Sequence, residues 1–88
     1  MKTIKDMPEH SRPREKLREN GAAVLTDEEL VAAILGMGTA GIDVLTMSRQ
    51  VAGLIREQRE GLTLDHLVTV PGMGLAKGAQ ILSAFELA

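Results

Sequence analysis

A single aromatic residue, Phe85, is present in the 88-residue chain, and this scarcity restricts the fold more than any other feature of the sequence. Hydrophobic residues make up 44% of the chain, so a core can form, but it must be built from Leu, Ile, Val, Ala and Met. Because β-sheets are enriched in aromatic and β-branched side chains, an aliphatic core of this kind favours helices. The length is that of one small domain. We therefore predict a single all-α domain over residues 1–88.

Five segments combine apolar residues at helical spacing with residues that start or stop a helix. Pro13 suits the first turn of the first helix, and Asn20-Gly21 predicts where that helix ends. Thr26 and Glu29 have the spacing of a capping box, in which each side chain accepts the backbone N–H of the other residue. These patterns predict a small five-helix bundle.

The later helices are bounded in the same way. Asp43 is a predicted N-cap for the third helix, and Thr63 is one for the fourth. The last helix is predicted from Leu75 to Leu87. Its apolar residues recur at i, i+4, i+7 and i+10, which places them along one side of the helix: Leu75, Ala79, Leu82 and Phe85.

Two glycine-rich turns divide the domain into similar halves. Residues 1–12 are predicted to be an arm, 13–61 a capping helix and a degenerate first hairpin, and 62–88 a helix-hairpin-helix unit. The Gly-x-Gly sequences at 36–38 and 72–74 each follow a short apolar helix and precede a longer one. Two interpretations stay open: a degenerate tandem pair of hairpins, or two glycine-rich turns that resemble each other by chance.

Composition excludes several classes of protein. The chain has no cysteine, and its two histidines, His10 and His66, lie far apart in sequence, so no metal site or other cofactor is predicted. No residue has the pattern of a nucleophile oriented by a base, so we predict no catalytic residue and no enzyme activity. No apolar run is long enough for a membrane span or a signal peptide, and we expect a cytoplasmic protein.

The turn before the last helix has the features of a phosphate-binding site. A helix N-terminus presents backbone N–H groups without partners, and its dipole favours an anion. Glycines in the turn are expected to adopt backbone angles closed to other residues, or to let a ligand approach the backbone. A bulky residue at Gly74 is therefore expected to disrupt the turn, and Met73 is expected to point inward. The predicted DNA-binding residues are Gly72, Met73, Gly74, Leu75, Ala76 and Lys77.

Residues 67–82, which include Pro71-Gly72-Met73-Gly74, resemble the helix-hairpin-helix motif of DNA repair and replication proteins. Arg12-Pro13-Arg14-Glu15-Lys16-Leu17 is similar to the N-terminal region of the bacterial RadC family, as are residues 4–9, 21–22 and 25–30. The resemblance covers nearly the whole chain. It implies a DNA repair protein in which this module precedes a metalloprotease-like JAB domain that these 88 residues do not contain.

The chain departs from that family in its first loop, where Gly36-Met37-Gly38 replaces a basic residue and a Thr-Gly pair. Its formal net charge is −2, with the basic excess confined to residues 1–20. Contact with phosphates is sequence-independent, and with so little positive charge we expect it to be weak. The sequence therefore leaves two functions open: binding to the DNA backbone, or protein–protein and interdomain contact by a degenerate hairpin.

Overall fold

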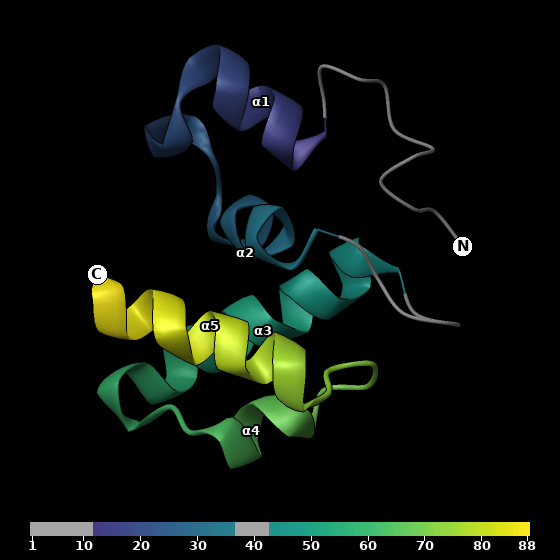
Figure 1. Cartoon of the computed structure of the whole chain (residues 1–88), viewed down its shortest axis with the longest axis vertical. Coiled ribbons are helices and arrows are strands. Elements are labelled where there is room, and N and C mark those ends of the chain that lie inside the picture. The colour runs from purple at the N-terminus through teal and green to yellow at the C-terminus, as the bar shows by residue number, and fades with distance from the viewer. Residues whose placement is uncertain (1–11, 37–42) are drawn as a thin grey trace.

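The computed structural model describes residues 12–36 and 43–88, and within them every regular element is a helix (Figure 1). The predicted all-α fold with five α-helices is confirmed, and two short 3₁₀ helices join them. The predicted arm lies, except for Arg12, outside the described residues. The elements in chain order are α1 (Pro13–Asn20), η3 (Ala22–Val24), α2 (Asp27–Leu35), α3 (Val44–Gln58), η4 (Arg59–Gly61), α4 (Leu64–Val68) and α5 (Leu75–Leu87).

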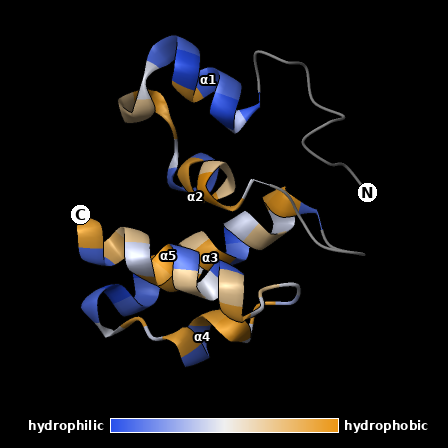
Figure 2. Cartoon of the chain, viewed as in Figure 1, coloured by the Kyte–Doolittle hydropathy of each residue, from blue (hydrophilic) through white to orange (hydrophobic). Residues whose placement is uncertain are grey.

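The helices are arranged around α3 and α5. Figure 1 shows α5 crossing in front of α3, with α2 on one side and α4 on the other, and α1 beyond α2. Helix α2 packs along α3, and α5 contacts both α4 and α2. Figure 2 shows α1 as the most hydrophilic of the helices. The core is aliphatic, as the composition predicts: Val31, Ala32, Leu35, Val44, Met47, Val51, Ala52, Leu62, Leu67, Val70, Met73 and Ile81.

The predicted N-caps are present. The Thr26 hydroxyl accepts the Glu29 N–H at 3.2 Å, and the Glu29 carboxylate accepts the Thr26 N–H at 2.8 Å, which completes the capping box. Asp43 accepts the Thr46 N–H at 2.8 Å. Each cap pairs backbone donors that the first turn of a helix otherwise leaves without partners. The helix boundaries therefore follow from local sequence.

Polar contacts and one proline attach α1 to the rest of the domain. Pro13 is buried. The Lys16 ammonium lies 2.9 Å from the Glu29 carboxylate, and the Arg14 side chain donates to the Ala33 carbonyl at 2.9 Å. That carbonyl belongs to the last turn of α2, where helix carbonyls lack partners within the helix and the dipole favours a cation. Glu29 thus has two roles, since it caps α2 and holds α1.

Helix α5 is rotated from the orientation that its apolar spacing predicts. The structure buries Gly78 and Ile81, whereas Leu75 is 68% exposed and Phe85 is 41% exposed. The buried side is the one that packs on α4, where a Cβ atom on Gly78 would lie 2.6 Å from the end of the Leu64 side chain. The smallest residue of α5, and not its largest, therefore sets the side that faces α4.

The pKa of Glu29 lies below its ordinary value of 4.5. The main cause is the hydrogen bond that its carboxylate accepts from the Thr26 backbone, followed by the hydrogen bond from Lys16; partial burial opposes both. Because the pKa is lowered in the folded state, Glu29 contributes stability above its unfolded pKa, and this contribution is lost as the pH falls through the folded pKa.

We predict that Glu29→Gln makes the stability of the domain less dependent on pH below about pH 4.5. Glutamine cannot form the charged interaction, so the variant should be less stable than wild type at neutral pH, and the difference should shrink in acid. Urea unfolding at a series of pH values measures this. Glu19→Gln, a change at an exposed position of α1, is the control. Equal loss of stability at every pH for Glu29→Gln would contradict the prediction.

Candidate nucleic-acid interface

A tight turn joins α4 to α5. The Met73 N–H donates to the Val70 carbonyl at 3.0 Å, which closes a four-residue turn with Pro71 and Gly72 at its centre. Gly72 has a φ of +88°. Proline at the second position and a positive φ at the third are the pattern of a type II turn. The local sequence Val-Pro-Gly-Met therefore explains the chain reversal without any contribution from the rest of the fold.

Two buried side chains hold this turn on the core. Val70 is 5% exposed and Met73 is 4% exposed, and both belong to the main apolar cluster. The predicted inward position of Met73 is confirmed. Pro71, Gly72 and Gly74 are exposed. The buried side chains thus hold the turn in place, while the backbone at Pro71, Gly72 and Gly74 stays at the surface.

The structure contradicts one of the two expectations for Gly74, a backbone angle closed to other residues. Its φ and ψ are −92° and −173°, an extended conformation that any residue adopts. Among the described residues, no atom outside its chain neighbours lies within 4 Å of the position of a Cβ on Gly74. The positive φ belongs to Gly72, because the turn needs it there. Gly74 is the N-cap of α5, where an extended conformation is the usual one.

The N-terminus of α5 has no side-chain cap. Its first three residues are Leu75, Ala76 and Lys77, and the first backbone bond across the turn runs from the Gly78 N–H to the Gly74 carbonyl at 3.0 Å. Gly74 has no side chain to cap the helix, in contrast to the Thr26, Asp43 and Thr63 caps. The leading amides of α5 therefore begin at an exposed residue and receive no side-chain acceptor from the N-cap.

The six predicted site residues are contiguous, and the fold presents most of them to solvent. Gly72, Gly74, Leu75 and Ala76 are exposed, and Lys77 is half-buried. Met73 is the exception, since its side chain lies in the core and only its backbone can take part in an interaction.

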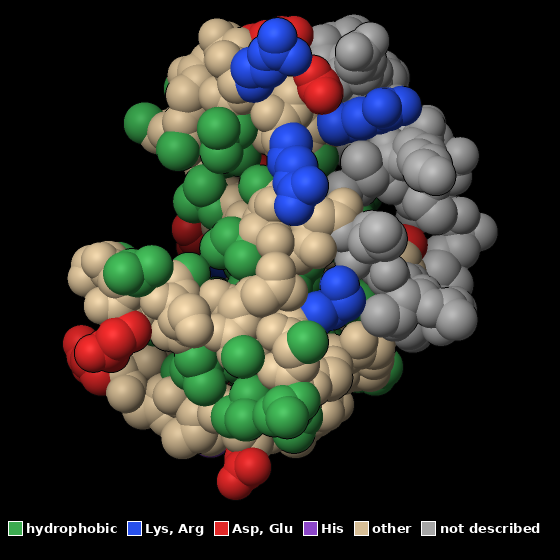
Figure 3. Space-filling view, viewed as in Figure 1, with side chains coloured by type: hydrophobic (Ala, Val, Ile, Leu, Met, Phe, Trp, Pro, Cys, Tyr) green, Lys and Arg blue, Asp and Glu red, His purple; other side chains and the backbone are tan. Residues whose placement is uncertain are grey.

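Positive charge is sparse around the turn. Lys77 is the only lysine or arginine in residues 62–88, which also contain Asp65 and Glu86. Figure 3 shows that most of the Lys and Arg side chains on the viewed face lie over the half that contains α1 and α2. An anion bound at this surface would therefore be held mainly by backbone amides and the dipole of α5.

One residue that helps to position the turn was not identified from the sequence. The Thr63 hydroxyl accepts the His66 N–H at 3.2 Å, as predicted, but the His66 ring also accepts the Thr63 N–H through Nδ1 at 3.0 Å. Histidine here takes the place that Glu or Gln has in a capping box. The signal in the sequence was the three-residue spacing between Thr63 and His66, which is the spacing of a capping box. His66 thus fixes the start of α4, the helix that leads into the turn.

The first glycine-rich turn is only partly described. Gly36 ends α2 with a φ of +81°, and a Cβ there would lie 2.6 Å from the Arg14 guanidinium. Residues 37–42 lie outside the described residues, so the turn of the predicted degenerate first hairpin, and with it the predicted tandem pair, stays a prediction. The described fold therefore explains why residue 36 is glycine, whereas it gives no such explanation for Gly74.

Residues 12–36 and 43–88 contain neither a cluster of metal-ligating side chains nor a membrane-spanning helix. This part of the chain contains no group of three or more His, Asp or Glu side chains placed to hold a metal ion. Nor does any helix in it have the length and apolar character needed to cross a membrane.

These features define a small all-helical domain in which two helices meet at a tight, surface-exposed turn. Residues 4–87 match the family described as UPF0758 N-terminal. The chain therefore belongs to the UPF0758 family, which is the RadC-like family that its motifs resemble. No solved structure gives a significant match to the chain.

Relatives in this family are considerably longer than the chain. The UPF0758 protein of Aquifex aeolicus is 43% identical over 86 residues, which cover 98% of this chain and 37% of the relative. The UPF0758 protein of Methanospirillum hungatei is 45% identical over 87 residues, which cover 99% of this chain and 38% of the relative. The chain thus spans less than two-fifths of the length of these relatives.

We predict opposite effects on stability for the two glycines of the turn. Gly72→Ala should lower the free energy of unfolding by about 1–2 kcal/mol, because a Cβ at positive φ clashes with the backbone. Gly74→Ser should leave it unchanged or raise it by up to about 1 kcal/mol, because serine is a better N-cap. Thermal or urea unfolding of both variants measures this. Similar destabilisation by the two substitutions would show that the turn geometry described here is wrong.

Proposed function

We propose that the turn and the first residues of α5 bind the phosphate backbone of DNA, without preference for sequence, as a helix-hairpin-helix motif. The observation that carries this proposal is the open backbone at Gly74. This residue begins an exposed helix N-terminus, and nothing within the described fold requires it to lack a side chain. The predicted contacts are the backbone of Gly72 to Lys77 and the Lys77 ammonium.

Three other glycines have reasons within the chain, whereas Gly53 and Gly61 share the open Cβ position of Gly74 but do not begin a helix. Gly72 takes the positive φ of the turn, Gly36 makes room for Arg14, and Gly78 makes room for Leu64. At Gly74 the Cβ position is open space. A phosphate oxygen that accepts the leading amides of α5 must approach this backbone closely, and a side chain at the N-cap would stand in its way.

DNA backbone is the anion that best fits the family and the form of the site. The resemblance to RadC implies a DNA repair protein, and an exposed turn can reach a phosphate on a continuous strand. Backbone amides contact phosphate and not base edges, so they position the protein without reading sequence. With one lysine nearby, we expect the weak end of non-specific affinity, about 10⁻⁴ M at physiological salt.

In a protein of the length of the relatives, this module would position the remainder of the polypeptide on DNA. The resemblance to RadC implies that this remainder is a metalloprotease-like JAB domain. The catalytic chemistry of such a protein would then reside outside these 88 residues.

We expect Gly74→Ser to weaken DNA binding at least several-fold while the domain stays folded. The serine Cβ would obstruct the phosphate, and its hydroxyl would accept the same amides that the phosphate needs. Fluorescence anisotropy with short single- and double-stranded DNA at low salt measures the affinity. Ser83→Ala, at an exposed position near the other end of α5, is the control. Unchanged affinity in Gly74→Ser would remove the main support for the proposal.

The salt dependence of binding tests Lys77. If its ammonium meets one phosphate, Lys77→Gln should reduce the slope of log affinity against log salt by about 0.9 for double-stranded DNA. Arg59→Gln is the matched control, because Arg59 lies in the groove at the C-terminal end of α5 and should leave the slope unchanged. An equal change in both variants would indicate general electrostatics and not a contact by Lys77.

The second candidate function is contact with another protein or domain. It is favoured by the net charge of −2 and by apolar side chains at both ends of α5, with Leu75 68% exposed and Leu87 89% exposed. Absence of DNA binding at low salt would leave this as the function of the module.

A further inference from the structure

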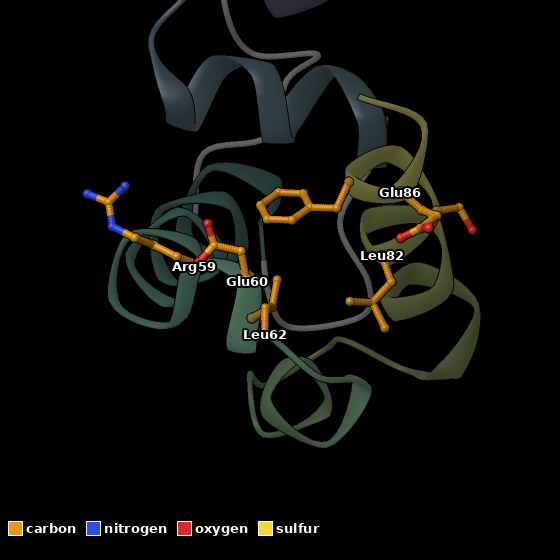
Figure 4. A pocket seen from close by; sticks show the side chains of 7 residues that line it. Arg59, Glu60, Leu62, Leu82 and Glu86 are labelled. Carbon is orange, nitrogen blue, oxygen red and sulfur yellow. The ribbon is translucent and has the colours of Figure 1, made fainter.

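A groove lies between the C-terminal half of α5 and η4, at the opposite end of α5 from the turn. It has a volume of about 490 Å³. Leu62, Leu82 and Phe85 supply its apolar part, and Glu60 and Glu86 contribute from opposite walls (Figure 4). Figure 4 also shows the side chain of Arg59 extending away from the α5 wall.

The groove exposes the aromatic side chain of Phe85 to solvent. Phe85, the sole aromatic residue of the chain, is 41% exposed there, although an 88-residue domain has few large side chains with which to build a core. Leu82 is only half-buried beside it. Aromatic residues are enriched at the centres of interfaces, where they fill pockets and lose contact with water.

The family relationship identifies what would cover the groove. The matched family is named for an N-terminal region, and the first relatives are more than twice as long as the matched segment. In such a relative the polypeptide continues from the end of the helix equivalent to α5, and the groove is lined by the last turns of that helix. The continuing polypeptide is therefore the partner whose local concentration at the groove is highest.

We infer that this groove is the docking site for the part of the polypeptide that follows the N-terminal region in full-length members of the family. The occupant is an apolar side chain that packs on Phe85, Leu82 and Leu62, with a lysine or arginine beside it. Glu60 and Glu86 on the two walls give the groove its preference for a basic neighbour. This inference gives a surface to the second candidate function, on which it rests, and it does not depend on DNA binding.

The chain contains no cysteine, so single cysteine variants test the inference directly. Ser83→Cys places a thiol in the groove, and Ala76→Cys places one at the exposed start of the same helix. Each variant is made in the 88-residue chain and in a full-length chimera, in which the remainder of the Aquifex aeolicus relative, free of cysteine, follows Ala88. The rate of labelling by a thiol reagent is then compared between the two lengths.

We expect the remainder to slow labelling at Ser83→Cys by at least about tenfold, a change that corresponds to about 1.4 kcal/mol of protection. Labelling at Ala76→Cys should stay within about twofold, so that the turn remains available. Adding Glu86→Lys or Phe85→Ser to the chimera should restore most of the labelling at position 83. Glu86 is exposed, so its substitution tests the groove without threatening the fold.

Three outcomes would overturn the inference. Unchanged labelling at position 83 in the chimera would show that the remainder does not cover the groove. Equal protection at positions 83 and 76 would indicate general shielding of α5. Protection in the 88-residue chain that rises with its concentration would assign the groove to a second copy of the chain. Failure of the phosphate proposal would instead appear in the DNA-binding measurements on Gly74 and Lys77.

Discussion

Burial of Val70 and Met73 in the aliphatic core holds the turn between α4 and α5, and the rest of the candidate site depends on that attachment. With both ends of the turn fixed, Pro71 and Gly72 close the chain reversal at the surface, and α5 must begin directly after them. The exposed start of α5 therefore has a fixed position relative to the core. The hydrophobic effect and the dispersion contacts of Val70 and Met73 with the core hold it there.

The turn illustrates how the same residue type can serve unrelated physical purposes. Gly72 satisfies a backbone angle, and Gly78 allows the approach of Leu64 from α4. Gly74 does neither, and the proposed function assigns its missing side chain to the close approach of a phosphate. In a sequence all three are simply glycine, and only the surroundings of each position separate a structural requirement from a functional one.

Helix α1 shows how a small domain attaches an element that has little apolar surface. Pro13 is its buried residue, and its polar contacts include the ion pair of Lys16 with Glu29 and the hydrogen bond of Arg14 to the end of α2. Ion pairs near the surface stabilise by only about 1 kcal/mol or less. Lys16 and Arg14 are thus used to hold α1 on α2.

The sequence by itself determined the helices, because caps and stops act within a few residues: the Thr26 box, the Asp43 cap and the Pro71-Gly72 turn all form as local chemistry predicts. It also determined that Met73 lies inside. Tertiary structure decided which side of α5 is buried, since that depends on Leu64 of a different helix meeting Gly78, and it left Leu75 and Phe85 exposed. The positive φ occurs at Gly72 and not at Gly74, a distinction that the local Pro-Gly turn explains. Periodicity records how often apolar residues recur along one helix, but the direction that a helix faces is set by the shapes of the residues it meets.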